Sequence, residues 1–325
     1  MSVILVGGSA GFIGSNFCHW LINNTEHYVV GVDNLSGGYY SNMPVSERFE
    51  FVNMDMCSDQ LQLVYANYEP DVTYALNCYA AEGRSNHIGR FIHSNNTLAL
   101  TNTLNNCVNF NSKIIFTSSV AVYSGNPPYH EDYPPHPIDF YGSSKLASER
   151  EIEIAGKYYG IEWCILRPRN VYGVRQSMWD KARNVIAIWC YQALNNKPIT
   201  VFGDGSNRRC FTYIDDILSP MYEALRYDKQ IINIGASKPY SIKQAAEMFM
   251  EVSGHDKIKY LEPREETPQA ICYTDKAEAL LNYRDETTLY DGLKKMWEWA
   301  KIQPVRNIDE PPPLEITKNT HSSLL

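Results

Sequence analysis

The first fourteen residues constrain the fold of this chain more than any other stretch. A short apolar run, Val3–Val6, leads into glycines three residues apart at Gly8, Gly11 and Gly14, and an apolar-periodic segment follows at once. This order predicts a buried strand, a glycine turn and a helix, the context in which such glycines indicate a dinucleotide site. They would serve the tight turn, the approach of backbone to a pyrophosphate, and packing of helix on strand.

The residues around this turn strengthen the dinucleotide interpretation. Backbone N–H groups at the helix start, at Phe12 and Ile13, would face an anion. A second apolar run ends in Asp33, about twenty residues past the last glycine, where a carboxylate meets the ribose hydroxyls of a dinucleotide. Glycines also occur in turns that only reverse the chain, but that alternative does not explain the position of Asp33. Asp33 would repel a 2′-phosphate, which favours NAD over NADP.

Composition excludes several classes of protein. The chain has 325 residues, enough for one large α/β domain or two lobes, with 44% hydrophobic residues and a net charge of −8. The acidic balance and the absence of a basic run speak against a nucleic-acid partner. No apolar stretch is long enough for a membrane span, and a cleaved signal peptide would remove the glycine turn, so neither is expected. The scattered cysteines predict reduced thiols in a cytoplasmic protein with no metal site.

Alternation of strand-like and helical segments predicts the fold class. The strand-like runs are Val3–Val6, Tyr28–Val32, Val72–Asn77, Lys113–Thr117 and Glu162–Leu166. The helical patterns are Phe12–Asn23, Ser94–Val108 and Ser143–Tyr159. We therefore expect an α/β fold, a doubly wound parallel sheet with helices on both faces.

The pattern changes after Arg167-Pro168, where loops lengthen and apolar pieces shorten. We expect residues 1–170 to form the sheet domain, with 211–235 returning to it. A smaller substrate lobe would comprise 171–210 and 236–303. The segment 304–325, with Pro311-Pro312-Pro313 and a polar end, is predicted to be an extended or disordered tail.

Tyr141 and Lys145 are the candidate catalytic pair. They stand one helical turn apart, and they follow a predicted strand whose carboxyl end carries Ser119. Ligands of doubly wound sheets bind at such strand ends, and an ammonium beside a phenol favours the phenolate, so Tyr141 is suited to act as a base. The same spacing recurs at Tyr290 and Lys294, where a packing tyrosine and a solvated lysine are the simpler interpretation.

These motifs, with Arg167-Pro-Arg-Asn170-Val-Tyr-Gly173, resemble those of the extended short-chain dehydrogenase/reductases. Within them the chain is similar to nucleotide-sugar epimerases of the UDP-glucose 4-epimerase type, from Val3 to about Trp299. The resemblance implies a Rossmann domain, bound NAD, a UDP-sugar substrate, and a homodimer paired through the helices near 94–108 and 143–159.

The resemblance also implies residue roles. Tyr141 matches the catalytic base, Lys145 the partner that lowers its pKa and holds the nicotinamide ribose, and Ser119 the contact to the substrate hydroxyl. Beyond the glycine turn, the implied cofactor contacts are Asp33, Asn34, Asp55, Met56, Ala80, Ala81 and Asn96. The implied substrate contacts are Ser119, Asn170, Arg209 and Arg264. Arg209 would grip a diphosphate, although a surface salt bridge with Asp215 or Asp216 is an alternative.

The residues after Ser119 bear on the reaction. Related dehydratases carry an Asp-Glu pair there and decarboxylases a Glu, whereas this chain has Val120-Ala121. Without that carboxylate, proton removal at C5 lacks an evident base, and oxidation and re-reduction at C4 remain. The predicted function is therefore inversion at C4 of a UDP-hexose or UDP-N-acetylhexosamine. A net oxidoreductase acting on a nucleotide-linked sugar is the alternative enzyme, and a catalytically inactive nucleotide-binding regulator is the non-enzyme alternative.

Substrate size is expected to depend on a residue shortly before Lys276-Ala277. A tyrosine at this position in the epimerases excludes N-acetyl sugars, and a small residue admits them. Here the position falls on Ala270 or Ile271, because one residue is missing between Arg264 and Lys276. Tyr273 lies close enough in sequence to fill the same space. Simple packing of Ala270 and Ile271 beneath the lobe is an equal alternative.

Overall fold

The computed structural model describes residues 1–180, 184–263, 269–304 and 306–321. Its centre is a seven-stranded sheet in which every neighbouring pair is parallel. In spatial order the strands are β11 (Gln230–Ile234), β6 (Trp163–Pro168), β5 (Lys113–Thr117), β4 (Val72–Ala75), β1 (Val3–Gly7), β2 (Tyr28–Asp33) and β3 (Phe49–Asn53). The strand order reverses between β1 and β4. In doubly wound sheets such a reversal marks the crevice where ligands bind.

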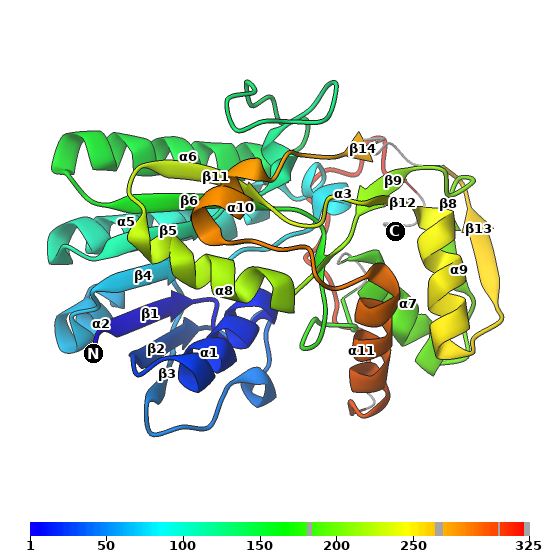
Figure 1. The fold of residues 1–325 in the computed structure, drawn as a ribbon, viewed down its shortest axis with the longest axis horizontal. Coiled ribbons are helices and arrows are strands. Elements are labelled where there is room, and N and C mark those ends of the chain that lie inside the picture. Colours follow the sequence, from blue (N-terminus) through cyan, green and yellow to red (C-terminus); the bar gives the residue numbers. More distant parts are fainter. Residues whose placement is uncertain (181–183, 264–268, 305, 322–325) are drawn as a thin grey trace.

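Helices cover both faces of this sheet, as the sequence predicts (Figure 1). One face carries α1 (Phe12–Asn24), α8 (Asp215–Glu223) and α10 (Asp275–Leu281). The other carries α2 (Leu61–Tyr68), α5 (Ala99–Phe110) and α6 (Phe140–Tyr159). The predicted α/β doubly wound class is therefore confirmed.

Short helical turns connect these elements. They are η1 (Tyr40–Asn42), α3 (Glu82–Ser85), α4 (Gly89–His93), η2 (Ser94–Leu98), η3 (Val120–Val122) and η4 (Ala224–Arg226). The helix predicted from Ser94 thus begins as the π turn η2 before it becomes α5. The edge strand β3 was not predicted from the sequence, because its residues are partly buried or exposed and polar residues interrupt its apolar run.

A smaller lobe follows β6 and packs beside the carboxyl edge of the sheet (Figure 1). It contains α7 (Val185–Leu194), α9 (Ile242–Ser253) and α11 (Leu289–Lys301). Its strand pairs are β8 (Ile199–Phe202) with β13 (Ile258–Leu261), and β9 (Arg208–Cys210) with both β12 (Pro239–Ser241) and β14 (Gln269–Ala270). Between β9 and β12 the chain returns to the sheet domain through α8 and β11.

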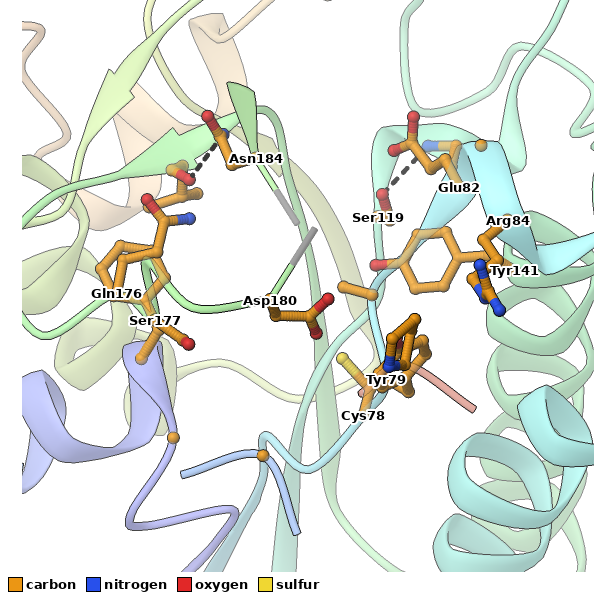
Figure 2. A pocket seen from close by; sticks show the side chains of 18 of the residues that line it. Cys78, Tyr79, Glu82, Arg84, Ser119, Tyr141, Gln176, Ser177, Asp180 and Asn184 are labelled. Carbon is orange, nitrogen blue, oxygen red and sulfur yellow. Dashed lines mark hydrogen bonds between the residues drawn. The ribbon is translucent and has the colours of Figure 1, made fainter. Parts of the chain in front are cut away.

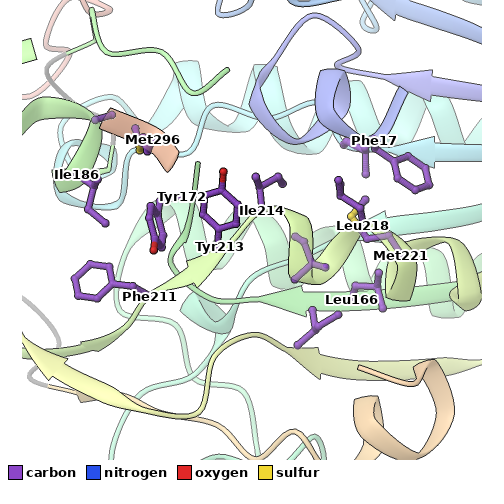
Figure 3. Close-up of a cluster of buried hydrophobic side chains, with 14 of the residues drawn as sticks. Phe17, Leu166, Tyr172, Ile186, Phe211, Tyr213, Ile214, Leu218, Met221 and Met296 are labelled. Carbon is purple, nitrogen blue, oxygen red and sulfur yellow. The ribbon is translucent and has the colours of Figure 1, made fainter. Parts of the chain in front are cut away.

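One continuous apolar core joins the lobe to the sheet domain. Phe17 of α1 lies with Leu218 and Met221 of α8 on the sheet, and the same cluster continues through Tyr213 to Met296 of α11 (Figure 3). The pair β7 (Val171–Tyr172) and β10 (Thr212–Tyr213) bridges the two regions inside this cluster. Continuity of the core holds the walls of the cleft in a fixed relation, because close-packed interiors deform little.

A buried ion pair fixes α6 to the sheet. Arg167 at the end of β6 donates through two nitrogens to the Glu149 carboxylate, at 2.8 and 2.6 Å, and both side chains are almost wholly buried. A bidentate pair of this kind sets orientation as well as distance. The helix that carries Tyr141 and Lys145 therefore has one register against the strand ends.

Two structural findings bear on the predictions about membrane spans and about the cysteines. Within the described residues, no helix combines the length and apolar character needed to cross a membrane. All eight cysteines are free thiols, and six of them are buried.

Candidate active site

A cavity of about 1270 Å³ lies at the carboxyl ends of β1, β4 and β5 and extends to the lobe. Drug-sized ligand pockets occupy about 300–1,000 Å³, so this one has room for two nucleotide-sized ligands. Figure 2 shows Ser119 and Tyr141 on one side of the space and Gln176 and Asn184 on the other.

The glycine turn has the geometry of a dinucleotide cradle. A Cβ on Gly14 would lie 2.0 Å from the Gly8 carbonyl oxygen, and Gly8 itself has φ +79°. α1 begins at Phe12 without a side-chain cap, so its first N–H groups are open to an anion from the cavity. All five predicted residues of the turn, from Gly8 to Gly14, line the cavity. The residues present therefore fit the pyrophosphate of NAD.

Asp33 lies beside this cradle, at the end of β2. Its carboxylate accepts from the backbone N–H groups of Ala10, at 3.0 Å, and Leu35, at 2.7 Å, and it lines the cavity at the end of β2. Burial raises the pKa of this carboxyl, while the hydrogen bonds from the backbone lower it. These hydrogen bonds orient the carboxylate beside the glycine turn, as the sequence predicts for a group that contacts ribose.

Most of the other predicted cofactor residues lie in the cavity wall. Asn34 donates to the Asp55 carboxylate at 2.9 Å, and both line the cavity with Met56 and Ala80. Two predicted contacts do not line it, Ala81 and Asn96.

The structure assigns a different position to these two residues. Ala81 is buried at the start of α3. Asn96 is buried behind the loop, where its amide oxygen accepts from the Tyr79 N–H at 2.8 Å and its nitrogen donates to Ser144. Asn96 therefore positions the loop after β4, and its side chain does not form part of the cavity lining.

The three predicted catalytic residues come together at the ends of β5 and α6. Ser119 caps the turn η3, with its hydroxyl accepting from the Ala121 N–H at 3.1 Å. Tyr141 lies in the first turn of α6, and Lys145 follows one turn later with its Nζ 6.0 Å from the Tyr141 ring centroid. All three line the cavity and are buried. Tyr290, in contrast, is partly exposed at the start of α11.

Electrostatics at Tyr141 differ from the simple expectation. Burial raises the pKa of its phenol well above the ordinary value of 10, and Cys78 and Glu82 raise it further, whereas a hydrogen bond with Ser119 lowers it. Lys145 donates to the Thr117 carbonyl at 2.7 Å, which directs its charge toward the strand end. In this arrangement desolvation decides the phenol's pKa, and proximity of Lys145 alone does not make a phenolate.

Glu82 and Cys78 are site residues that sequence reasoning missed. Both line the cavity, Cys78 after β4 and Glu82 at the start of α3, and Figure 2 shows them on either side of Tyr141. Directly after Ser119, where related dehydratases carry an acid, Val120 and Ala121 line the cavity. A carboxylate nevertheless reaches this site from another element. Glu82 stands directly after Ala80-Ala81, and this adjacency was the available signal.

The substrate side of the cavity is formed by later segments. Asn170, with φ +39°, lines the cavity after β6, and its buried amide nitrogen has no hydrogen-bond partner. An orphaned buried donor costs about 1–3 kcal/mol, so this geometry fits an acceptor on a ligand. Arg209 of β9 also lines the cavity. The two acids considered as salt-bridge partners of Arg209 have other partners: Asp215 pairs with Lys295, and Asp216 accepts hydrogen bonds from Thr287. Arg264 lies outside the described residues.

The candidate residues for substrate size fall beside β9. The backbone of Ala270 pairs with Arg209, and the Ile271 carbonyl accepts from the Tyr129 N–H at 3.0 Å. Tyr273 stacks on His130 with ring centroids 3.9 Å apart. Neither Ile271 nor Tyr273 lines the cavity, so the Tyr273 ring does not fill it.

Fold and site together define a dinucleotide-dependent enzyme with a Ser-Tyr-Lys centre. The chain belongs to the NAD dependent epimerase/dehydratase family, whose model matches residues 4–235. NAD is its cofactor.

Individual relatives are similar to this protein over nearly the whole chain. A putative UDP-glucose 4-epimerase of Methanocaldococcus jannaschii is 32% identical, with 92% of this chain and 98% of that protein covered. The structure of a Thermotoga maritima UDP-glucose 4-epimerase with UDP-glucose matches with a TM-score of 0.86 at 29% identity, covering 91% and 98% of the two chains. A Bacillus cereus UDP-glucuronic acid 4-epimerase with UDP-glucuronic acid and NAD gives 0.85 at 30% identity, covering 92% and 99%.

Cofactor choice tests the position of Asp33. The native protein should bind NAD in strong preference to NADP, because a carboxylate repels the 2′-phosphate. Replacing Asp33 with Ser and Asn34 with Arg should move the preference toward NADP, measured as the ratio of the two dissociation constants. Equal affinity of the native protein for both cofactors would show that Asp33 does not meet the ribose.

The charge of Glu82 should be visible in the pH dependence of turnover. Glu82→Gln removes a negative charge that raises the pKa of Tyr141, so that pKa should fall. If the phenolate is the base, the acid limb of the kcat profile shifts to lower pH. Glu153→Gln on the outer face of α6 is the matched control and should leave the profile unmoved. A shift to higher pH in Glu82→Gln would contradict this coupling.

Proposed function

We propose that this chain is a UDP-sugar 4-epimerase that inverts C4 of a UDP-hexose or UDP-N-acetylhexosamine through a 4-keto intermediate. The observation that carries the proposal is the convergence of Ser119, Tyr141 and Lys145 at the strand ends of a cavity that also holds the glycine cradle. The named relatives act on UDP-glucose and UDP-glucuronic acid at C4.

The residues divide the proton chemistry among themselves. Tyr141 takes the proton of the sugar 4-hydroxyl and later returns it to the same oxygen. Ser119 orients that oxygen and hydrogen-bonds the phenol, which stabilises its charged form. Lys145, held by the Thr117 carbonyl, is the cation beside the phenol and the partner for the nicotinamide ribose. NAD, when bound, supplies the acceptor and donor for the hydride of C4.

Substrate contacts in this proposal come from the lobe. The free amide nitrogen of Asn170 would donate to the sugar nucleotide, and Arg209 would bind the diphosphate as a guanidinium fork. Arg264 is assigned to the same diphosphate by family resemblance. The oxidised sugar must turn over within this cavity, which has a volume of about 1270 Å³.

The alternatives differ in stoichiometry. A net oxidoreductase would release reduced cofactor at every turnover, whereas an epimerase shows no net change in cofactor absorbance. An inactive regulator would bind NAD without any turnover. The intact and buried Ser-Tyr-Lys set favours an enzyme over this alternative.

We also propose a cytoplasmic homodimer. α5 and α6 lie side by side on one face of the sheet, and large apolar side chains on that side are exposed, including Leu98, Ile154 and Tyr158. Pairing of these helices across a two-fold axis would cover them. The free cysteines agree with a reducing compartment.

Replacing Tyr141 by Phe should separate chemistry from binding. We expect the fold and the bound NAD to persist while kcat falls at least ~10²-fold, because the proton acceptor is lost. The measurement is steady-state conversion of a UDP-sugar together with cofactor content after gel filtration. Tyr290→Phe carries the same change at the second Tyr-x-x-x-Lys and should be almost silent. Near-normal turnover of Tyr141→Phe would remove the proposed base.

Substrate breadth tests the prediction that the position of Ala270 or Ile271 sets the size of the sugar. Since the Tyr273 ring stacks outside the cavity, we expect activity on both UDP-N-acetylhexosamines and plain UDP-hexoses. Size differences of one or two groups change selectivity by only ~1–3 kcal/mol, so preference and not strict choice is predicted. Steady-state rates on UDP-glucose, UDP-galactose and their N-acetyl counterparts decide this. Strict rejection of the N-acetyl pair would mean that a bulky side chain closes the site.

A further inference from the structure

The C-terminal segment after α11 does not leave the molecule but crosses the cavity. Its residues 308–313 belong to the cavity wall together with the glycine turn and Tyr141. In Figure 1 the red end of the chain passes between the sheet domain and the lobe. The motifs that carry the family resemblance end near Trp299, before this segment, and they give it no role.

The first anchor lies at the adenosine end of the cradle. The Arg306 guanidinium lies 4.3 Å from the Tyr39 ring centroid and 4.9 Å from that of Trp179. Asp309 accepts from the Tyr39 hydroxyl at 2.8 Å, and its N–H donates to the Trp179 carbonyl at 2.7 Å. Tyr39 follows Gly38, whose backbone is so close to the glycine turn that a Cβ would lie 2.4 Å from the Ala10 oxygen.

The second anchor lies at the reaction end. Arg84 of α3, two residues past Glu82, donates to the Pro312 carbonyl at 2.7 Å. The Glu315 carboxylate accepts from the N–H groups of Arg90 and Phe91, at 2.8 and 2.9 Å, at the start of α4. The N–H groups of Glu315 and Ile316 both donate to the His87 carbonyl.

The segment between the two anchors shares the cavity wall with Asp33 and Tyr141. It is held at Tyr39, which follows Gly38 beside the glycine turn, and at Arg84, which is two residues past Glu82. Three consecutive prolines, Pro311–Pro313, occupy this span. Proline restricts the unfolded chain, which lowers the entropy lost when the segment docks.

We propose that residues 306–316 form a strap that completes the NAD site and retains the cofactor between turnovers. The inference rests on the proposed function, since an epimerase that returns its hydride gains nothing from releasing NAD. Departure of NAD past this wall requires the strap to detach. Its role is therefore in the dissociation rate of the cofactor and not in the chemical step.

The test is the release of labelled NAD from the loaded full chain during a chase with unlabelled NAD. A chain ending at Gln303 should release NAD about tenfold faster or more, because affinity differences among variants reside mainly in dissociation rates. Asp309→Ala, which breaks the first anchor, should also accelerate release. Lys318→Ala is the matched control in the same segment, since that exposed side chain is not among the anchoring contacts, and it should release NAD at the native rate.

Unchanged release from the shortened chain would overturn the strap. If circular dichroism shows that the shortened chain does not fold, NAD release is measured instead on the double variant Asp309→Ala/Glu315→Ala. Release from this variant at the native rate overturns the proposal. The two proposals fail separately. If the full chain holds NAD and truncation accelerates its release, but the full chain converts no UDP-sugar, only the epimerase proposal is contradicted. An active epimerase whose NAD release ignores the strap contradicts the strap alone.

Discussion

The contact between Gly142 and the carbonyl oxygen of Ala121 is the constraint on which the reactive centre depends. A Cβ at Gly142 would lie 2.2 Å from that oxygen, so only glycine lets the first turn of α6 lie against the turn after β5. This approach brings Tyr141 within a hydrogen bond of Ser119 and lets Lys145 reach the Thr117 carbonyl. The buried Arg167–Glu149 pair then holds the helix in that register. Gly14 against Gly8 is the same device at the cofactor end.

Local sequence was sufficient for the fold class and for the centre of the site. Strand, glycine turn, helix and Asp33 are contiguous signals, and parallel strands place their carboxyl ends together whatever lies between them. Ser119 and Tyr141 could therefore be paired across a loop of unknown shape. Ala81 and Asn96 could not be placed correctly, because their direction depends on how α3 and η2 pack behind the loop.

Features that depend on the tertiary arrangement could not be predicted from the sequence. Glu82 enters the site from α3, and its effect on Tyr141 follows from burial that no spacing reveals. The proline-rich tail has the composition of a free end, yet its carbonyl and carboxylate groups meet partners on Arg84 and α4. Burial is the largest influence on the pKa of the Tyr141 phenol, and the neighbouring Cys78 and Glu82 raise that pKa further. A charge beside a buried group acts more strongly than it would in water.

The fate of hydrogen at C4 tests the central claim most directly. UDP-glucose deuterated at C4 is incubated with the NAD-loaded protein in ordinary water, and the product is examined by NMR. An epimerase that passes hydride to its cofactor and takes it back yields the C4 epimer with the deuterium retained, and no reduced cofactor accumulates. Loss of deuterium to water, or stoichiometric reduced cofactor without the epimer, would contradict the account.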